Sequence, residues 1–122
     1  MSYHQDWLMR QIETIAAMLA YMLTGKKPKM LSTEEDLRNS TDSGLLYEKL
    51  KALVTQGKFC EGENLLFAAM EEGNPEVPSA AVRFYMDLNQ LTDAQLEEGN
   101  FSREEILDGL KAVCSHYGLN LF

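Results

Sequence analysis

Apolar residues recur along the first quarter of the chain with the period of an α-helix. From Gln5 to Leu23 their spacing alternates between four and three residues, which is the pattern of a coiled-coil-like seam. Further apolar side chains flank this seam on both sides and widen the apolar arc to roughly 220°, whereas about 100° suffices for one core face. The pattern therefore predicts a helix that contacts its own domain and a second apolar neighbour.

The apolar residues of this helix define a candidate interface. Its members are the seam residues and the larger side chains beside them: Trp7, Leu8, Met9, Ile12, Ile15, Met18, Leu19 and Met22. We expect the helix, within residues 1–25, to pack against its copy in a homodimer or a small homo-oligomer. The alternative within the same pattern is a helix buried at the centre of its own monomer.

Attachment to a membrane is a third possibility for residues 5–23. Trp7 would lie near the interface, and Lys26, Lys27 and Lys29 would contact anionic headgroups. The net charge of −8 argues against this arrangement, because an acidic protein is repelled by anionic lipid. Asp6 and Glu13 on the polar arc of the helix argue against it as well. A membrane-spanning helix is not expected either, because the uninterrupted apolar run Ile15–Leu23 is shorter than the ~20 residues that span a bilayer. We therefore do not expect membrane binding.

The rest of the chain predicts further helices and no strands, because no segment alternates apolar and polar residues over a sustained length. Residues 26–41 are polar and predict a linker, and Thr41–Ser43 are residues that cap a helix well. Within the predicted helical body, 42–122, helical periodicity places segments at about 44–57, 59–72, 79–90 and 103–117. Thr92 and Ser102 each precede Gln or Glu by three residues, which is the capping-box spacing. Residues 1–122 thus predict one all-α domain of about five to six helices.

Charge and cysteine content restrict the classes of function. Residues 1–29 carry a net charge of +2 and residues 30–122 a net charge of −10, so no basic face for nucleic acid is expected. Cys60 and Cys114 are far apart and lack metal-binding or CxxC spacing. Two such thiols indicate a reduced, cytoplasmic protein.

Side chains that support catalysis are present but form no recognised pattern. His116 and Cys114 are two residues apart, so on a helix they point in different directions. Glu104 and Asp108 are spaced as a pair on one helix face, yet carboxylates there are also favoured by the helix N-terminus. No metal-binding helix motif or phosphate loop occurs. We predict no catalytic residue, no metal and no cofactor.

A pocket built from residues remote in sequence is the alternative to a purely protein-binding role. The chain would then be a small enzyme or a small-molecule-binding protein. The first polar candidates for such a pocket are Tyr85, Arg83, Tyr117 and His116.

Leu46–Pro75 partly resembles one tetratricopeptide-type helical hairpin. With Gly57 as the turn, Gly62 takes the small position where the second helix crosses the first, Leu66 the aromatic position and Ala69 a second small position. Two residues of the first helix depart from the pattern, and no second copy follows at about 34 residues. The resemblance implies one antiparallel hairpin and no repeat array.

A broader resemblance covers most of the chain. Gln5–Glu13, Gly57–Phe67 and Leu91–Leu110 are similar to a family of small, uncharacterised bacterial helical proteins. This resemblance implies an all-helical single domain in a bacterial cytosol and supplies no activity. Residue pattern and resemblance together predict a non-catalytic interaction module, which self-associates through its first helix and offers an acidic surface to a protein partner.

Overall fold

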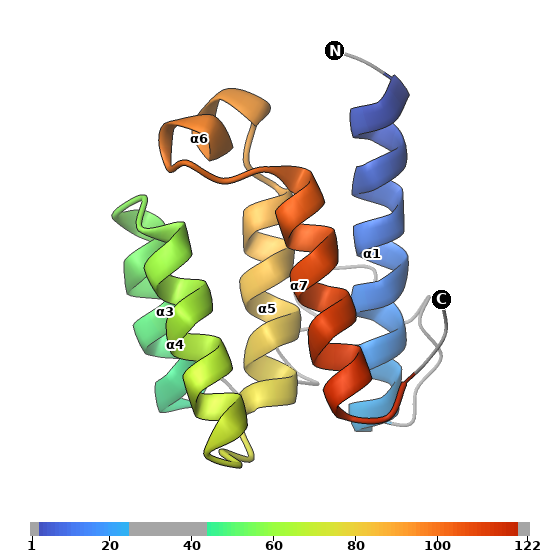
Figure 1. Cartoon of the computed structure of the whole chain (residues 1–122), viewed down its shortest axis with the longest axis vertical. Helices are drawn as coiled ribbons and strands as arrows, with labels where there is room; N and C mark the ends of the chain where they lie inside the picture. The colour runs from blue at the N-terminus through green and yellow to red at the C-terminus, as the bar shows by residue number, and fades with distance from the viewer. Residues whose placement is uncertain (1–2, 25–43, 120–122) are drawn as a thin grey trace.

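The computed structural model describes residues 3–24 and 44–119, in which it contains six α-helices and no strand (Figure 1). The helices are α1 (Tyr3–Thr24), α3 (Leu45–Thr55), α4 (Phe59–Glu71), α5 (Val77–Asn89), α6 (Asp93–Glu98) and α7 (Arg103–His116). The predicted all-α fold is confirmed. The predicted linker and the capping residues Thr41–Ser43 lie outside the described residues.

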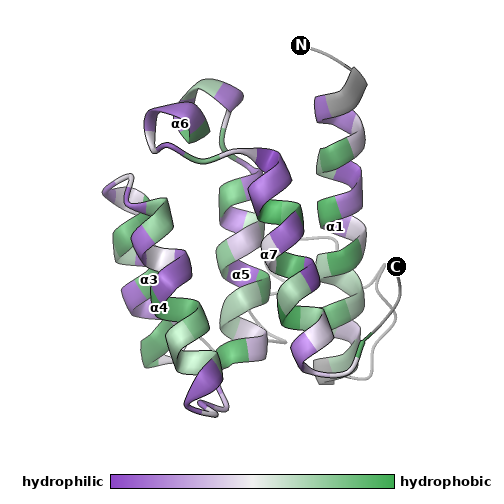
Figure 2. Cartoon of the chain, in the orientation of Figure 1, coloured by the Kyte–Doolittle hydropathy of each residue, from purple (hydrophilic) through white to green (hydrophobic). Residues whose placement is uncertain are grey.

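α5 is the central helix of the bundle. α1, α3, α4 and α7 all pack against it, and α1 also packs against α7 (Figure 1). The hairpin formed by α3 and α4 lies on one side of α5, and α1 and α7 lie on the other. Hydrophobic residues run along the helices that meet at this centre (Figure 2).

The sequence of α5 explains its central position. Its buried residues are Val77, Ala80, Ala81, Val82, Phe84, Tyr85, Leu88 and Asn89, and a helix that is apolar around most of its circumference belongs inside a bundle. The predicted start near Ser79 was two residues late. Pro78 lies within the first helical turn, where the missing N–H of proline costs no hydrogen bond.

Local capping fixes where the shorter elements begin. Thr92 and Gln95 form the predicted capping box, with Gln95 N donating to Thr92 Oγ1 over 3.1 Å and Thr92 N donating to Gln95 Oε1 over 2.9 Å. Ser102 Oγ accepts from the backbone N–H of Glu105 at the start of α7. α3 begins differently, because Glu76, next to α5, accepts a 2.8 Å hydrogen bond from Leu46 N.

The predicted hairpin is present as α3 and α4, and its likeness to a tetratricopeptide unit stays a prediction. Gly62 is buried, as expected of a small position, but its nearest neighbour lies on α5. A Cβ at Gly62 would lie 2.9 Å from Phe84 Cε1 and 3.8 Å from Leu53 Cβ of α3. The small residue is therefore required chiefly by the docking of the hairpin on α5.

A buried arginine joins the ends of three helices. The Arg103 side chain, 3% exposed, donates from Nη1 to Asn89 O over 2.9 Å and from Nη2 to Leu91 O over 2.6 Å. Its Nε donates to Asp93 Oδ1 over 3.1 Å, in an ion pair. Asn89 also accepts from Nη1 through its side chain and donates to Met9 O of α1. The guanidinium thus ties the end of α5 to the starts of α6 and α7.

Replacing Arg103 should therefore cost more than an ordinary surface change. We expect Arg103→Lys to lower the free energy of unfolding by about 3 kcal/mol, because an ammonium group cannot reach the three acceptor residues that the planar guanidinium contacts. Urea denaturation measures the loss, with Arg10→Lys at an exposed position of α1 as the control. Equal stability of the two variants would contradict the structural role of Arg103.

Candidate interaction surface

α1 presents one of its apolar faces to its own bundle. Leu8, Ile12, Ile15 and Leu19 are at most 5% exposed, and α1 packs against α5 and α7. The sequence prediction placed these four residues at an interface between subunits. The structure corrects that part of the prediction, because they already belong to the core of the single chain.

The side of α1 that adjoins this buried face keeps large apolar side chains in contact with solvent. Trp7 is 53% exposed and Met22 is 57% exposed, and Met18 is half-buried. At about 100° per residue these three side chains share one side of the helix. We call this side the outer face of α1 and define it by Trp7, Gln11, Thr14, Met18, Tyr21 and Met22. Met9, the remaining predicted interface residue, lies beside the buried Ala16 and Ala20, on the margin of the buried face far from Trp7, and is half-buried.

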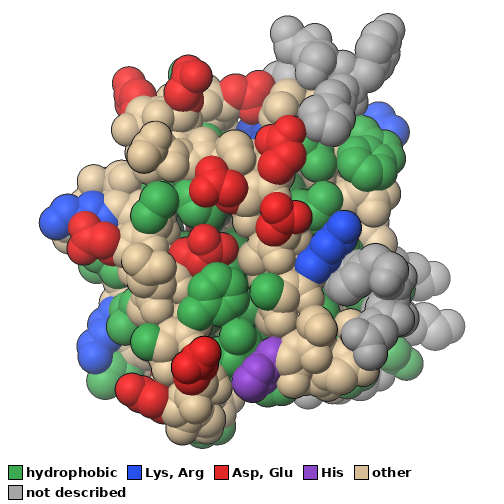
Figure 3. All heavy atoms as spheres, in the orientation of Figure 1, with side chains coloured by type: hydrophobic (Ala, Val, Ile, Leu, Met, Phe, Trp, Pro, Cys, Tyr) green, Lys and Arg blue, Asp and Glu red, His purple; other side chains and the backbone are tan. Residues whose placement is uncertain are grey.

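The outer face of α1 has no ionisable group charged at neutral pH, in contrast to the rest of the described chain. Residues 44–119 contain six Lys and Arg against thirteen Asp and Glu, a net charge of −7. α1 contains Asp6, Arg10 and Glu13, a net charge of −1, and none of them belongs to the outer face. Figure 3 shows acidic side chains spread over α4, α6 and α7. The chain therefore combines an uncharged helix face, which carries several large apolar side chains, with an acidic body.

A partly buried carboxylate lies where α4, α5 and α7 approach one another. The buried Tyr85 donates its hydroxyl proton to Glu63 Oε2 over 2.8 Å. Burial raises the pKa of Glu63, and the nearby carboxylates of Glu105 and Asp108 raise it further, while the hydrogen bond from Tyr85 lowers it. Burial and the Glu63 carboxylate together raise the pKa of Tyr85. Tyr85 therefore stays protonated and acts as a hydrogen-bond donor.

Gly109 of α7 provides the space for this contact. A Cβ at Gly109 would lie 2.3 Å from both Glu63 Oε2 and the Tyr85 hydroxyl oxygen. The sequence analysis did not identify Glu63 or Gly109. A glycine inside a helix was the available signal, because it lowers helix propensity and often marks a close contact.

The four polar residues proposed for a remote pocket are not brought together. Tyr85 contacts Glu63, whereas the Arg83 guanidinium lies 4.1 Å above the ring of Tyr47 on α3. His116 and Tyr117 stack edge to face at the end of α7, with ring centroids 4.9 Å apart, and both are exposed. These residues line no common site among the described parts of the chain.

The other catalytic candidates are separated by their exposure. Cys114 is buried and its burial raises the pKa of the thiol, which disfavours the reactive thiolate. His116 is exposed, as are Glu104 and Asp108. In residues 3–24 and 44–119, no group of three or more His, Cys, Asp or Glu side chains is arranged to hold a metal ion. No helix in the same part of the chain is long and apolar enough to cross a membrane.

The fold is that of a small all-helical protein, and comparison with known families identifies the family to which it belongs. Residues 2–118 match the model of a family of unknown function, DUF6483, and the chain belongs to that family. No curated protein and no solved structure matches the chain. The predicted membership of an uncharacterised helical family is confirmed, and the family supplies no activity.

The close contact at Gly109 predicts that alanine at this position lowers stability, whereas helix propensity alone predicts that it raises stability. Alanine in place of a helical glycine normally adds about 1 kcal/mol of stability. We expect Gly109→Ala to lower the free energy of unfolding by about 2 kcal/mol instead, because the buried Tyr85 ring has little room to move away from the new methyl group.

Urea denaturation of the Gly109→Ala variant tests this contact. Ala112→Gly, at an exposed position of α7, supplies the propensity effect without a steric contribution. A Gly109→Ala variant more stable than the wild type would show that α7 does not approach Glu63 and Tyr85 this closely.

Proposed function

We propose that this chain is a non-catalytic, cytoplasmic protein-interaction module that self-associates through the outer face of α1. The exposure of Trp7 and Met22 on a helix whose adjoining face is already in the core carries this proposal. Large apolar side chains that remain exposed together along one element are characteristic of a surface that binds another protein. Methionine suits such a surface because its flexible side chain adapts to its partner.

A second copy is the partner that the charges favour. Two copies that met through their bodies would bring together two net charges of −7, and like charges oppose association. The outer face of α1 carries no charge, and it lies beside the buried face that packs against α5 and α7. Contact through this face keeps the acidic bodies on the outside of the dimer. The acidic face of α4, α6 and α7 then remains available to a further protein.

An antiparallel arrangement of the two α1 helices fits the order of residues along the outer face. In a two-fold contact the same patch faces itself, so the Trp7 end of one copy then lies against the Met18 and Met22 end of the other. The polar residues Gln11 and Thr14 lie near the two-fold axis.

The size of this face predicts a weak dimer. One helix face offers less than the ~800 Å² per partner of a standard interface. Association should therefore depend on protein concentration, with dissociation of the dimer on dilution.

Light scattering on a size-exclusion column over a range of concentrations tests the proposal. We expect the solution mass to rise from 13.8 kDa towards twice that value as concentration increases. Met22→Glu and Trp7→Glu should remove this rise, because each places a charge in the apolar contact. Substitutions at Leu8 or Ile15 would unfold the core and would not test the interface.

Leu45→Glu is the matched control for these variants. Leu45 is 66% exposed but lies on α3, away from α1, so its substitution should leave association unchanged. Circular dichroism verifies that each variant keeps its helices. A wild type that stays at 13.8 kDa at every concentration, or a folded Met22→Glu variant that still dimerises, would contradict the proposal.

A further inference from the structure

Glu63 is the point at which the α3–α4 hairpin reaches α7. Its carboxylate extends from α4 across α5, where it accepts the hydrogen bond from Tyr85. Because the Gly109 Cβ position lies 2.3 Å from Glu63 Oε2, the carboxylate rests against the backbone of α7. The two parts of the bundle that flank α5 thus meet at an ionisable group.

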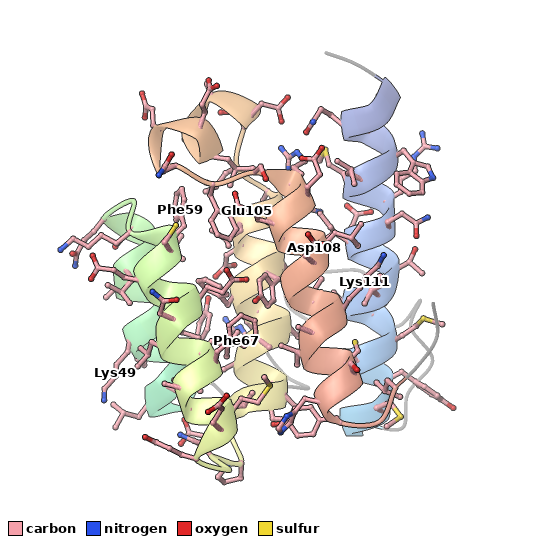
Figure 4. All side chains as sticks on the ribbon, in the orientation of Figure 1. Lys49, Phe59, Phe67, Glu105, Asp108 and Lys111 are labelled. Carbon is pink, nitrogen blue, oxygen red and sulfur yellow. The ribbon has the colours of Figure 1, made fainter. Side chains whose placement is uncertain are left out.

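The charges around Glu63 are of its own sign. Tyr85 of α5 and Glu105 and Asp108 of α7 are the titratable groups that act on it. Lys111 of α7 extends on the side of that helix nearer α1, and Lys49 of α3 lies at the outer edge of the hairpin (Figure 4). The ionised carboxylate is therefore partly desolvated and faces two further carboxylates, with one hydroxyl donor to stabilise it.

We propose that Glu63 is a proton-operated latch between the α3–α4 hairpin and α7, closed when its carboxyl group is neutral and loosened when it is ionised. The neutral carboxyl still accepts the hydrogen bond from Tyr85, and it removes both the repulsion from Glu105 and Asp108 and the cost of burying a charge. Because Gly109 has no side chain, the neutral carboxyl group of Glu63 can pack directly against α7. Mild acidification thus tightens the packing of the hairpin.

The direction of the pH effect follows from proton binding. The pKa of Glu63 is raised in the folded chain by burial first and by its neighbouring carboxylates next. Between the unfolded and the folded pKa the folded chain binds more protons, so the contribution of Glu63 to stability increases as the pH falls. This contribution is lost as the pH rises through the folded pKa. Acid normally has the opposite effect on carboxylates that are paired in the native state.

The test compares the pH dependence of unfolding in the wild type and in Glu63→Gln. Each unit by which the two pKa values of Glu63 differ should raise the folded-to-unfolded ratio of the wild type by up to about tenfold on acidification from about pH 7. Glu63→Gln should lack this part of the response and should be at least as stable as the wild type at about pH 7. Glu61→Gln, at an exposed position of the same helix, should respond like the wild type.

A direct titration keeps the test decisive if Glu63→Gln folds poorly. Carboxyl-carbon NMR of the wild type should show Glu63 losing its proton at higher pH than glutamate in the unfolded chain, and Asp108→Asn should move that transition of Glu63 to lower pH. Amide hydrogen exchange in α4 and α7 should slow on acidification by more than the intrinsic pH effect. A Glu63 that loses its proton no higher in pH than glutamate in the unfolded chain, or an unchanged pH response in Glu63→Gln, would overturn the proposal.

Discussion

The packing of four helices around α5 is the constraint on which the rest of the structure depends. Alanine at positions 80 and 81 allows close approach, and the large side chains of Phe84 and Tyr85 reach towards neighbouring helices. The charged side chains of α5 find partners on α3. Arg83 lies over the ring of Tyr47, and Asp87 accepts a 2.6 Å hydrogen bond from the Tyr47 hydroxyl. Burial and this carboxylate raise the pKa of Tyr47 to about 12, so the hydroxyl remains a donor.

Helix content and several helix ends could be predicted from the sequence because they depend on local chemistry. The capping box at Thr92 and the glycine that follows the last helix are examples, and Gly118 has the positive φ of 84° that such a position requires. The identity of the central helix could not be predicted in the same way. Periodicity indicates how wide the apolar face of a helix is, and the apolar face of α1 is wider than that of α5.

The candidate surfaces show the same limit. The sequence named the apolar residues of α1, but it could not divide them between a core and an exposed face, because both faces are apolar. Only the packing against α5 and α7 separates Leu8 from Trp7. Glu63 gave no signal of its own among many acidic residues. Its setting arises from three helices that are distant in sequence, with Gly109 as the one local sign of close approach.

The two cysteines occupy opposite extremes of accessibility. Cys60 is exposed in the first turn of α4, whereas Cys114 is buried near the end of α7, where burial raises the pKa of its thiol. Electrophiles and oxidants react with accessible thiolates, so the folded chain offers them Cys60 and shields Cys114. Modification of Cys114 requires α7 to separate from the bundle. Reaction of the Cys114 thiol therefore reports the loss of native packing around α7.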